Sequence, residues 1–179
     1  MKNLYSLAIL FTFLNVHPAS AEDVNIDYVY SGDHNTDFSN ISVSLKIGEF
    51  NDDRESDPRQ IADNYLAEAP LTDIIRGALV QGLEHGGASL VEASEDMQIT
   101  GRIVSSQMQL VDRGGVESIQ LTIRTQLALQ GGGRTIWETT LFGRGTVPIS
   151  EGITGAVRGA LDRTIRELVN DDYFVIELQ

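Results

Sequence analysis

The pattern of apolar residues predicts an α+β fold, a two-layer sandwich with two amphipathic helices on one face of a mainly antiparallel sheet of about four to five strands. Three observations lead to this prediction. Apolar side chains alternate at period two over much of residues 97–147, and they recur every three to four residues in two other segments. Glycine-containing turns separate the alternating segments from one another.

The first strand is predicted at Ile41–Ile47, where apolar and polar residues alternate. Gly48 follows it and indicates a bulge or a close backbone approach. Asn51–Asp63 is rich in charge, contains proline and has no periodicity, so we expect a loop there. The first helix is predicted from Pro70, which suits an opening turn, to Gly86–Gly87, which suits a helix end.

Three long strands are predicted after this helix, forming an antiparallel meander: Met97–Leu110, Ile119–Leu129 and Arg134–Val147. In the first of them, apolar residues change from odd to even positions near Val104–Gln107, which indicates a β-bulge. Turns are predicted at Asp112–Gly115 and Gly131–Gly133.

The last helix is predicted to begin at Ser150 as its N-cap, with a buried stripe over Ile153–Val169. Gly152, Gly155 and Gly159 lie near that stripe and would permit close packing on the sheet. The segment 171–179 contains a short apolar run, and we expect either a final strand or a docking tail.

Residues 1–21 have the order of a cleavable signal peptide. Lys2 precedes an apolar run from Leu4 to about Val16, and the small-residue triplet Ala19–Ala21 follows Pro18. The run is shorter than the roughly 20 residues that a bilayer span requires. We therefore expect cleavage after Ala21 and a periplasmic protein of one domain. Residues 22–39 would form a loosely held arm, and residues 40–179 would form the α+β domain.

Charge and cysteine content exclude several classes of protein. The chain has a formal net charge of −13, so nucleic acid is not an expected partner because its phosphates would be repelled. The sequence contains no cysteine, which excludes disulfides and thiolate metal sites. A lipid anchor on the first mature residue would also need a cysteine, and Glu22 stands at that point, so we expect no lipid anchor.

The segments taken together resemble the YajG-type lipoproteins of Gram-negative bacteria over roughly residues 40–175. The resemblance rests on Ile41–Leu45 before an Asp/Arg-rich loop, Leu71–Leu83, Met97–Leu110, Gly115–Leu129 and Ile153–Leu161. It implies an envelope protein with an α+β fold and no established enzyme activity. Members of that family carry a lipidated cysteine, which is replaced here by the Ala21-Glu22 junction. The resemblance assigns no functional residues.

Three groups of residues have some features of chemical sites. Asp53, Glu55 and Asp57 have the alternate spacing of a calcium loop, but Pro58 and Asn64 occupy the positions where such a loop needs Gly and Glu. A solvated loop is the better interpretation, and binding of divalent cations by the acidic surface is an alternative function.

The histidines after the predicted cut, His34 and His85, lie in unrelated contexts, so no zinc site is predicted. The position of His85 in the last helical turn favours a role at the helix end. Glu92, Glu95 and Asp96 lie between the first helix and the meander, where a carboxylate-dependent hydrolase could form its site. That hydrolase is the second alternative function.

We expect a non-catalytic envelope protein, a binding or assembly module with no cofactor, no metal and no catalytic residues. Its partner would be another envelope protein or a second copy of the chain, bound through a sheet face or edge. Trp137 and Phe142 have opposite phases in one strand, so one of them is expected to point outward. These two residues are the candidate partner surface.

Overall fold

The computed structural model describes residues 21–32, 37–93 and 95–179. The predicted signal peptide falls almost wholly on residues 1–20, outside the described residues, and so does His34. None of the helices in the described ranges combines the length and the hydropathy that crossing a bilayer would require.

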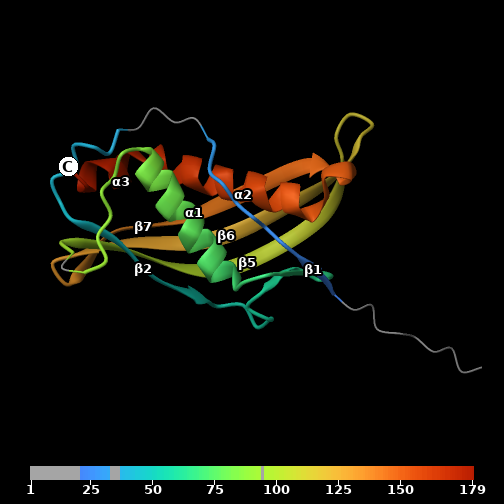
Figure 1. Ribbon diagram of the computed structural model, residues 1–179, viewed down its shortest axis with the longest axis horizontal. Coiled ribbons are helices and arrows are strands. Elements are labelled where there is room, and N and C mark those ends of the chain that lie inside the picture. The colour runs from blue at the N-terminus through green and yellow to red at the C-terminus, as the bar shows by residue number, and fades with distance from the viewer. Residues whose placement is uncertain (1–20, 33–36, 94) are drawn as a thin grey trace, which may run out of the picture.

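A four-stranded sheet forms one layer of the molecule, with the strand order β2-β5-β6-β7 (Figure 1). Its strands are β2 (Leu45–Asp52), β5 (Met97–Asp112), β6 (Glu117–Gly131) and β7 (Arg134–Pro148). β5, β6 and β7 form the predicted antiparallel meander, whereas β2 joins β5 in parallel. Both predicted hairpins are present, and Gly132 and Gly133 at the second turn have the positive φ angles of a type I′ turn.

Two helices cover one face of this sheet, as predicted (Figure 1). They are α1 (Leu71–His85) and α2 (Gly152–Val169). The core lies between the layers, where odd-numbered residues of β6 meet the apolar stripes of both helices. The α+β class and the two-layer packing therefore match the sequence prediction.

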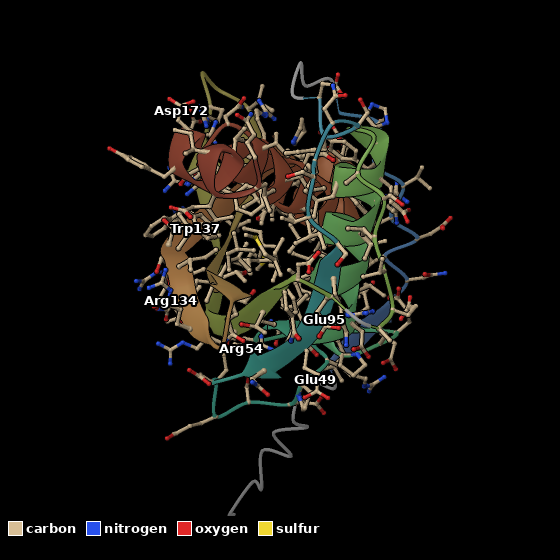
Figure 2. All side chains as sticks on the ribbon, turned by 90° about the vertical axis from the view of Figure 1, so that its left-hand side faces the viewer. Glu49, Arg54, Glu95, Arg134, Trp137 and Asp172 are labelled. Atoms are coloured by element: carbon tan, nitrogen blue, oxygen red, sulfur yellow. The ribbon has the colours of Figure 1, made fainter. Side chains whose placement is uncertain are left out.

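Figure 2 looks along the long axis of the molecule and shows side chains filling the space between the helices and a curved sheet.

The predicted bulge in β5 is confirmed, because the register with β6 shifts between Ile103 and Ser105. Before the shift, Ile99 and Ile103 face the helices from odd positions. After it, Met108 pairs with Leu121 and faces the same side from an even position. The extra residue therefore keeps the apolar side chains of β5 on the helix face while the polar side chains stay on the other.

A second, small sheet has the order β1-β4-β3 and was not predicted as a sheet. Its strands are β1 (Glu22–Val24), β3 (Gln60–Ala62) and β4 (Tyr65–Ala67), each three residues long. The expected loop at Asn51–Asp63 is therefore partly wrong, since β2 continues to Asp52 and β3 lies within it. Ser106 Oγ donates to the Ile61 carbonyl at 2.6 Å, which attaches the small sheet to β5.

The expectation of a loosely held arm at residues 22–39 is wrong for its described part. Ile26, Tyr30 and Phe38 are buried in the same core as the helices. The segment also crosses the helical layer (Figure 1), where Tyr28 Oη donates to Asp162 at 2.7 Å. Burial and this carboxylate raise the pKa of the Tyr28 hydroxyl well above its ordinary value. The described part of this segment, which we call the strap, is held on the domain because it buries apolar side chains and forms these hydrogen bonds.

Side chains of α1 and α2 also bind the backbone of this strap. Gln81 accepts from the Tyr30 N–H at 2.9 Å and donates to the Tyr28 carbonyl at 3.2 Å. Arg158 donates to the Asp27 carbonyl at 3.2 Å. Backbone N–H and C=O groups of the strap, which would otherwise need water as a partner, are thus hydrogen-bonded to helix side chains.

The C-terminal segment has one of its two expected forms, the docking tail, because Phe174 and Leu178 are buried in the core. It contains a short helix, α3 (Asp172–Glu177), so the final strand is wrong. Asp171 caps this helix by accepting from the Phe174 N–H at 3.0 Å. Phe174 is fully buried and packs against Trp137 with ring centres 5.0 Å apart.

The expected N-cap at Ser150 is also wrong, because a 3₁₀ turn, η1 (Ile149–Glu151), comes first and α2 begins at Gly152. Close packing of α2 on the sheet depends chiefly on Gly143 and Gly145 of β7. A Cβ atom on Gly145 would collide with Ala156 O and lie 2.7 Å from the backbone N of Ala160. Of the helix glycines expected to allow this approach, Gly159 does meet Gly145 closely.

Candidate functional site: the outer face of the sheet

The face of the sheet that points away from the helices is polar, and its middle is lined by amide, hydroxyl and guanidinium groups. The strand register sets the order of these groups. Gln107 of β5 lies opposite Thr122 of β6, which lies opposite Arg144 of β7. In the neighbouring row, Arg124 of β6 lies opposite Phe142 of β7. Directly paired side chains share a face of the sheet, so these residues form one surface.

A groove of about 570 Å³ lies on this surface, between the turn after β3 and the halves of β5, β6 and β7 nearest the β5–β6 hairpin. Its floor includes Gln107, Gln120, Thr122, Arg124, Phe142 and Arg144. We call this hollow the sheet groove. The small sheet forms one of its walls, because Ala62, Asp63 and Asn64 of the β3–β4 turn also line it.

The charge of the sheet groove differs from that of the whole chain. Its lining includes Arg124 and Arg144, with Asp63 as the one acidic side chain, in a protein of net charge −13. Within the described ranges, neither arginine forms an ion pair with a carboxylate. The groove thus offers two cations that are not ion-paired, against one carboxylate on its wall.

Of the two residues expected to form a partner surface, Phe142 is exposed and Trp137 is buried. Phe142 is 45% exposed and lies in the sheet groove, with the Arg124 guanidinium 5.2 Å from its ring centre. Trp137 is only 8% exposed and packs on Phe174, at the side of β7 (Figure 2). Trp137 is therefore not part of the candidate surface, and its ring instead helps to attach α3 to β7. One residue is buried and the other exposed because, as expected, they point to opposite faces of β7.

Helix side chains occupy both edges of the four-stranded sheet near their centres. On β2, Arg76 of α1 donates to the carbonyls of Ile47 and Gly48, each at 3.0 Å. On β7, Glu167 of α2 accepts from the Phe142 N–H at 3.1 Å. Since a strand joining the sheet would need these backbone groups, the two edges are obstructed at these points.

The bulge predicted at Gly48 explains the first of these contacts. The β2–β5 register shifts between Ile47 and Phe50, and a bulge disrupts the alternation of carbonyl directions along a strand. Two successive carbonyls can therefore face one guanidinium. At Gly48 a Cβ would meet the Gln98 side chain, which lies against the glycine and would have to move.

The carboxylates considered for a hydrolase are engaged singly. Asp96 accepts from the Ser44 N–H at 2.9 Å and the Ser44 hydroxyl at 2.8 Å, and both bonds hold its pKa below the ordinary value. The pKa of Glu95 is also lowered, first by its own backbone N–H and then by Lys46 at 3.5 Å. A general acid would need the opposite shift. Glu92 is exposed on the preceding loop.

The acidic loop is organised by ion pairs. Arg54 binds Asp52 at 2.6 Å and the carbonyl of Gln60 at 2.5 Å, which closes the loop onto itself. Burial alone would raise the pKa of Asp52, but the hydrogen bonds and charge of Arg54 outweigh it and lower the pKa. Asp53 pairs with Arg102 at 2.9 Å.

No group of three or more His, Asp or Glu side chains within the described ranges is placed to hold a metal ion. His85 lies in the last turn of α1, where the sequence places it, and its ring meets that of Tyr30 edge-on at 5.4 Å.

Sequence reasoning did not single out Arg124, Arg144, Gln107 or Gln120. The available signal was the polar phase of β6, in which Gln120, Thr122 and Arg124 alternate with buried residues. What that phase could not reveal was the register that brings Phe142 beside Arg124.

Comparisons with known proteins define the fold and leave the function open. No family model matches the chain, and no curated protein matches it. Among solved structures, a protein from Xanthomonas campestris described by the family DUF330 has a TM-score of 0.65 at 15% identity. The match covers 87% of this chain and 97% of that one.

Two further solved structures have lower scores. An uncharacterized protein has a TM-score of 0.51 at 13% identity, covering 83% of this chain and 94% of its own. A minor lipoprotein from Acinetobacter baumannii has a TM-score of 0.46 at 11% identity, covering 77% and 92%, which is too low for an inference.

At these identities, the first two matches show a shared fold alone. The neighbours thus include a DUF330 protein and a lipoprotein from Gram-negative bacteria, and the narrower resemblance to the YajG-type proteins remains a prediction.

Proposed function

We propose that this chain is a non-catalytic binding module of the bacterial envelope that engages its partner through the sheet groove. The observation that carries the proposal is the pair Arg124 and Arg144 beside the exposed ring of Phe142, with neither cation ion-paired to a carboxylate of the described residues. Exposed aromatic and arginine side chains are the types enriched where proteins bind partners.

The face is a better contact than the edges of the sheet. Strand addition requires free main-chain donors and acceptors along an edge. Arg76 already binds two carbonyls of β2, and Glu167 already binds an N–H of β7. A partner that added a strand would have to displace these side chains, whereas the sheet groove is open.

The arrangement of titratable groups also supports a binding role. Asp52 pairs with Arg54, Asp53 pairs with Arg102, and Asp96 is bound by Ser44. Each of these carboxylates has a local structural partner. A pair of catalytic carboxyl groups needs two different pKa values, with the pKa of the acid raised toward neutral pH. The resolved pKa shifts of Asp52, Glu95 and Asp96 are all downward.

Export with removal of residues 1–21 forms part of the proposal. It is supported by the cation, apolar run and small-residue triplet of that segment. The first strand, β1, begins at Glu22, which would be the first residue of the mature chain. An intact mass corresponding to residues 22–179 in a periplasmic extract would support this part, and an uncleaved or acylated mass would contradict it.

Site-specific photo-crosslinking in intact cells tests the binding role. A photoreactive aromatic amino acid at position 142 should form a discrete envelope adduct, because that ring opens into the groove. The matched control is the same amino acid at position 173, since Tyr173 is 77% exposed but lies on α3. Equal adducts from both positions, or none from position 142, would overturn the proposed surface.

A further inference from the structure

We propose that the sheet groove binds a carboxylate-bearing oligosaccharide, a chain of sugar rings with acidic groups. This inference rests on the proposed function, because it names the class of ligand for the same surface. Three properties of the groove lead to it: an excess of positive charge, with two arginines that are not ion-paired against the single carboxylate of Asp63, a row of neutral hydrogen-bonding side chains, and one half-exposed aromatic ring.

The cations select for a carboxylate. Arg124 and Arg144 lie on adjacent strands in neighbouring rows of the sheet, so their guanidinium groups serve the same stretch of groove. A planar guanidinium binds a carboxylate through two parallel hydrogen bonds. The overall charge of −13 would repel an anion elsewhere on the protein, so an acidic ligand has an electrostatic reason to choose this groove.

The neutral side chains select for hydroxyl groups. Gln107 and Gln120 each carry an amide that both donates and accepts, and Thr122 adds a hydroxyl. These three residues lie on two paired strands, with Gln107 directly opposite Thr122. A ligand with many hydroxyl groups can pair with such a row, whereas a fatty acyl chain would leave the amides without partners.

Phe142 supplies the apolar contact that a sugar ring needs. Its face carries partial negative charge, which attracts the slightly positive C–H groups on the flat side of a pyranose. Arg124 lies over the ring and is thereby held in the groove. Behind the ring, the backbone N–H of Phe142 is fixed by Glu167. The aromatic platform and the nearest cation are therefore positioned before any ligand arrives.

An acidic peptide is the competing ligand, and the groove suits it less well. An extended peptide gains affinity mainly by adding to a sheet edge, and the groove is on the face of the sheet, across β5, β6 and β7. Besides Phe142, the apolar residues of its lining are Ala62 and Met108, and Met108 packs against the core from the helix face, so the groove offers few apolar pockets for alternate peptide side chains. A free poly-glutamate peptide serves as the test of this alternative.

The direct test is calorimetric titration of the purified mature chain with oligogalacturonate, an oligosaccharide with one carboxylate on each ring. We expect saturable binding at low-millimolar ligand or better, weakened by added salt because ion pairs contribute. Its methyl ester keeps the sugar rings but lacks the charge, and should bind at least about tenfold more weakly. Equal binding of acid and ester would overturn the role of the arginines.

Three variants locate the ligand. Arg124→Gln and Arg144→Gln should each weaken oligogalacturonate binding about tenfold, and Phe142→Ala should weaken binding of the ester as well as of the acid. The control is Arg134→Gln, which removes the same charge at the far end of β7, outside the groove lining. Unchanged affinity in both groove variants, or an equal loss in the control, would contradict the assignment. Circular dichroism and an unfolding curve for each variant establish that it is folded.

The outcomes separate this inference from the proposed function. Binding of poly-glutamate as tight as that of oligogalacturonate would overturn the carbohydrate assignment. Absence of any oligogalacturonate binding would do the same. In either case, a crosslinked adduct specific to position 142 would leave the proposed function standing. Loss of that adduct would instead remove the proposed function, on which the ligand assignment depends.

Discussion

The carboxylate of Glu167 accepts a hydrogen bond from the Phe142 N–H at 3.1 Å. A residue of helix α2 thus controls the backbone of the residue whose ring opens on the opposite face of the sheet. Arg163, one turn earlier, holds the same carboxylate at 2.7 Å. The helical layer therefore fixes the geometry of a surface that it does not touch.

Replacing Glu167 with alanine should raise hydrogen exchange at the Phe142 amide about fivefold. The expected cause is loss of a hydrogen bond worth roughly 1 kcal/mol. Residue-level hydrogen exchange by NMR measures it. Glu167→Gln is the matched control, because its side-chain carbonyl can still accept the bond and should preserve most of the protection. Equal exchange in wild type and Glu167→Ala would show that the bond contributes nothing to edge protection.

Gly145→Ala should destabilise the fold by about 2–3 kcal/mol. The added methyl group would meet the backbone of α2 at Ala156 and Ala160, where neither main chain can yield easily. Gly77→Ala in α1 has open space around the new methyl group and should stabilise the protein by about 0.5–1 kcal/mol, the ordinary gain in a helix. Urea unfolding compares the two, and a Gly145→Ala protein as stable as wild type would contradict the packing.

Phe174→Ala should loosen α3 and expose Trp137. The buried ring of Phe174 lies 5.0 Å from that of Trp137, and removing a buried phenylalanine typically costs about 3 kcal/mol or more. Trp137 is the only tryptophan of the chain, so its fluorescence emission should shift to longer wavelength. Tyr173→Ala changes an exposed residue of the same helix and should leave the emission unchanged. An unshifted spectrum in Phe174→Ala would argue against this contact.

Asp52→Asn should lower stability at neutral pH by about 1 kcal/mol, because Arg54 loses its charged partner in a partly solvent-screened site. The pKa of Asp52 is lowered in the folded protein, so its contribution is present above the pKa of the unfolded chain, near pH 4. That contribution is lost as the pH falls through the lower folded value. The unfolding free energies of wild type and variant should therefore converge in acid. A constant difference down to the acid limit would refute the linkage.

The long elements could be predicted from the sequence because their periodicity extends over many residues. In β6, apolar residues occupy every odd position from Ile119 to Leu129 except Thr125, and the phase change of β5 marks its bulge. The short elements escaped for the opposite reason. Three-residue strands such as β3 and β4 carry too little pattern, and the apolar run at Tyr173–Ile176 suits a strand as well as a helix.

The candidate site was only half predictable. Opposite phases for Trp137 and Phe142 follow from counting along β7, but which of them faces the helices depends on the β6–β7 register. The two arginines of the sheet groove lie on different strands, and Arg124 lies beside Phe142 only because of the register in which β6 and β7 pair. Burial of the strap at Ile26 and Tyr30 depends on the surface of the folded helices, which local sequence does not encode.

The start of β1 has a consequence for maturation. The Glu22 N–H donates to the Asn64 carbonyl at 2.8 Å, and β1 runs parallel to β4 from that residue onward. If the chain is cut after Ala21, the peptide bond to be cleaved adjoins the first hydrogen bond of the small sheet. A peptidase that holds its substrate in extended form must bind this segment before β1 pairs with β4. Processing and completion of the fold would then follow a fixed order in time, with the cut first and the strand second.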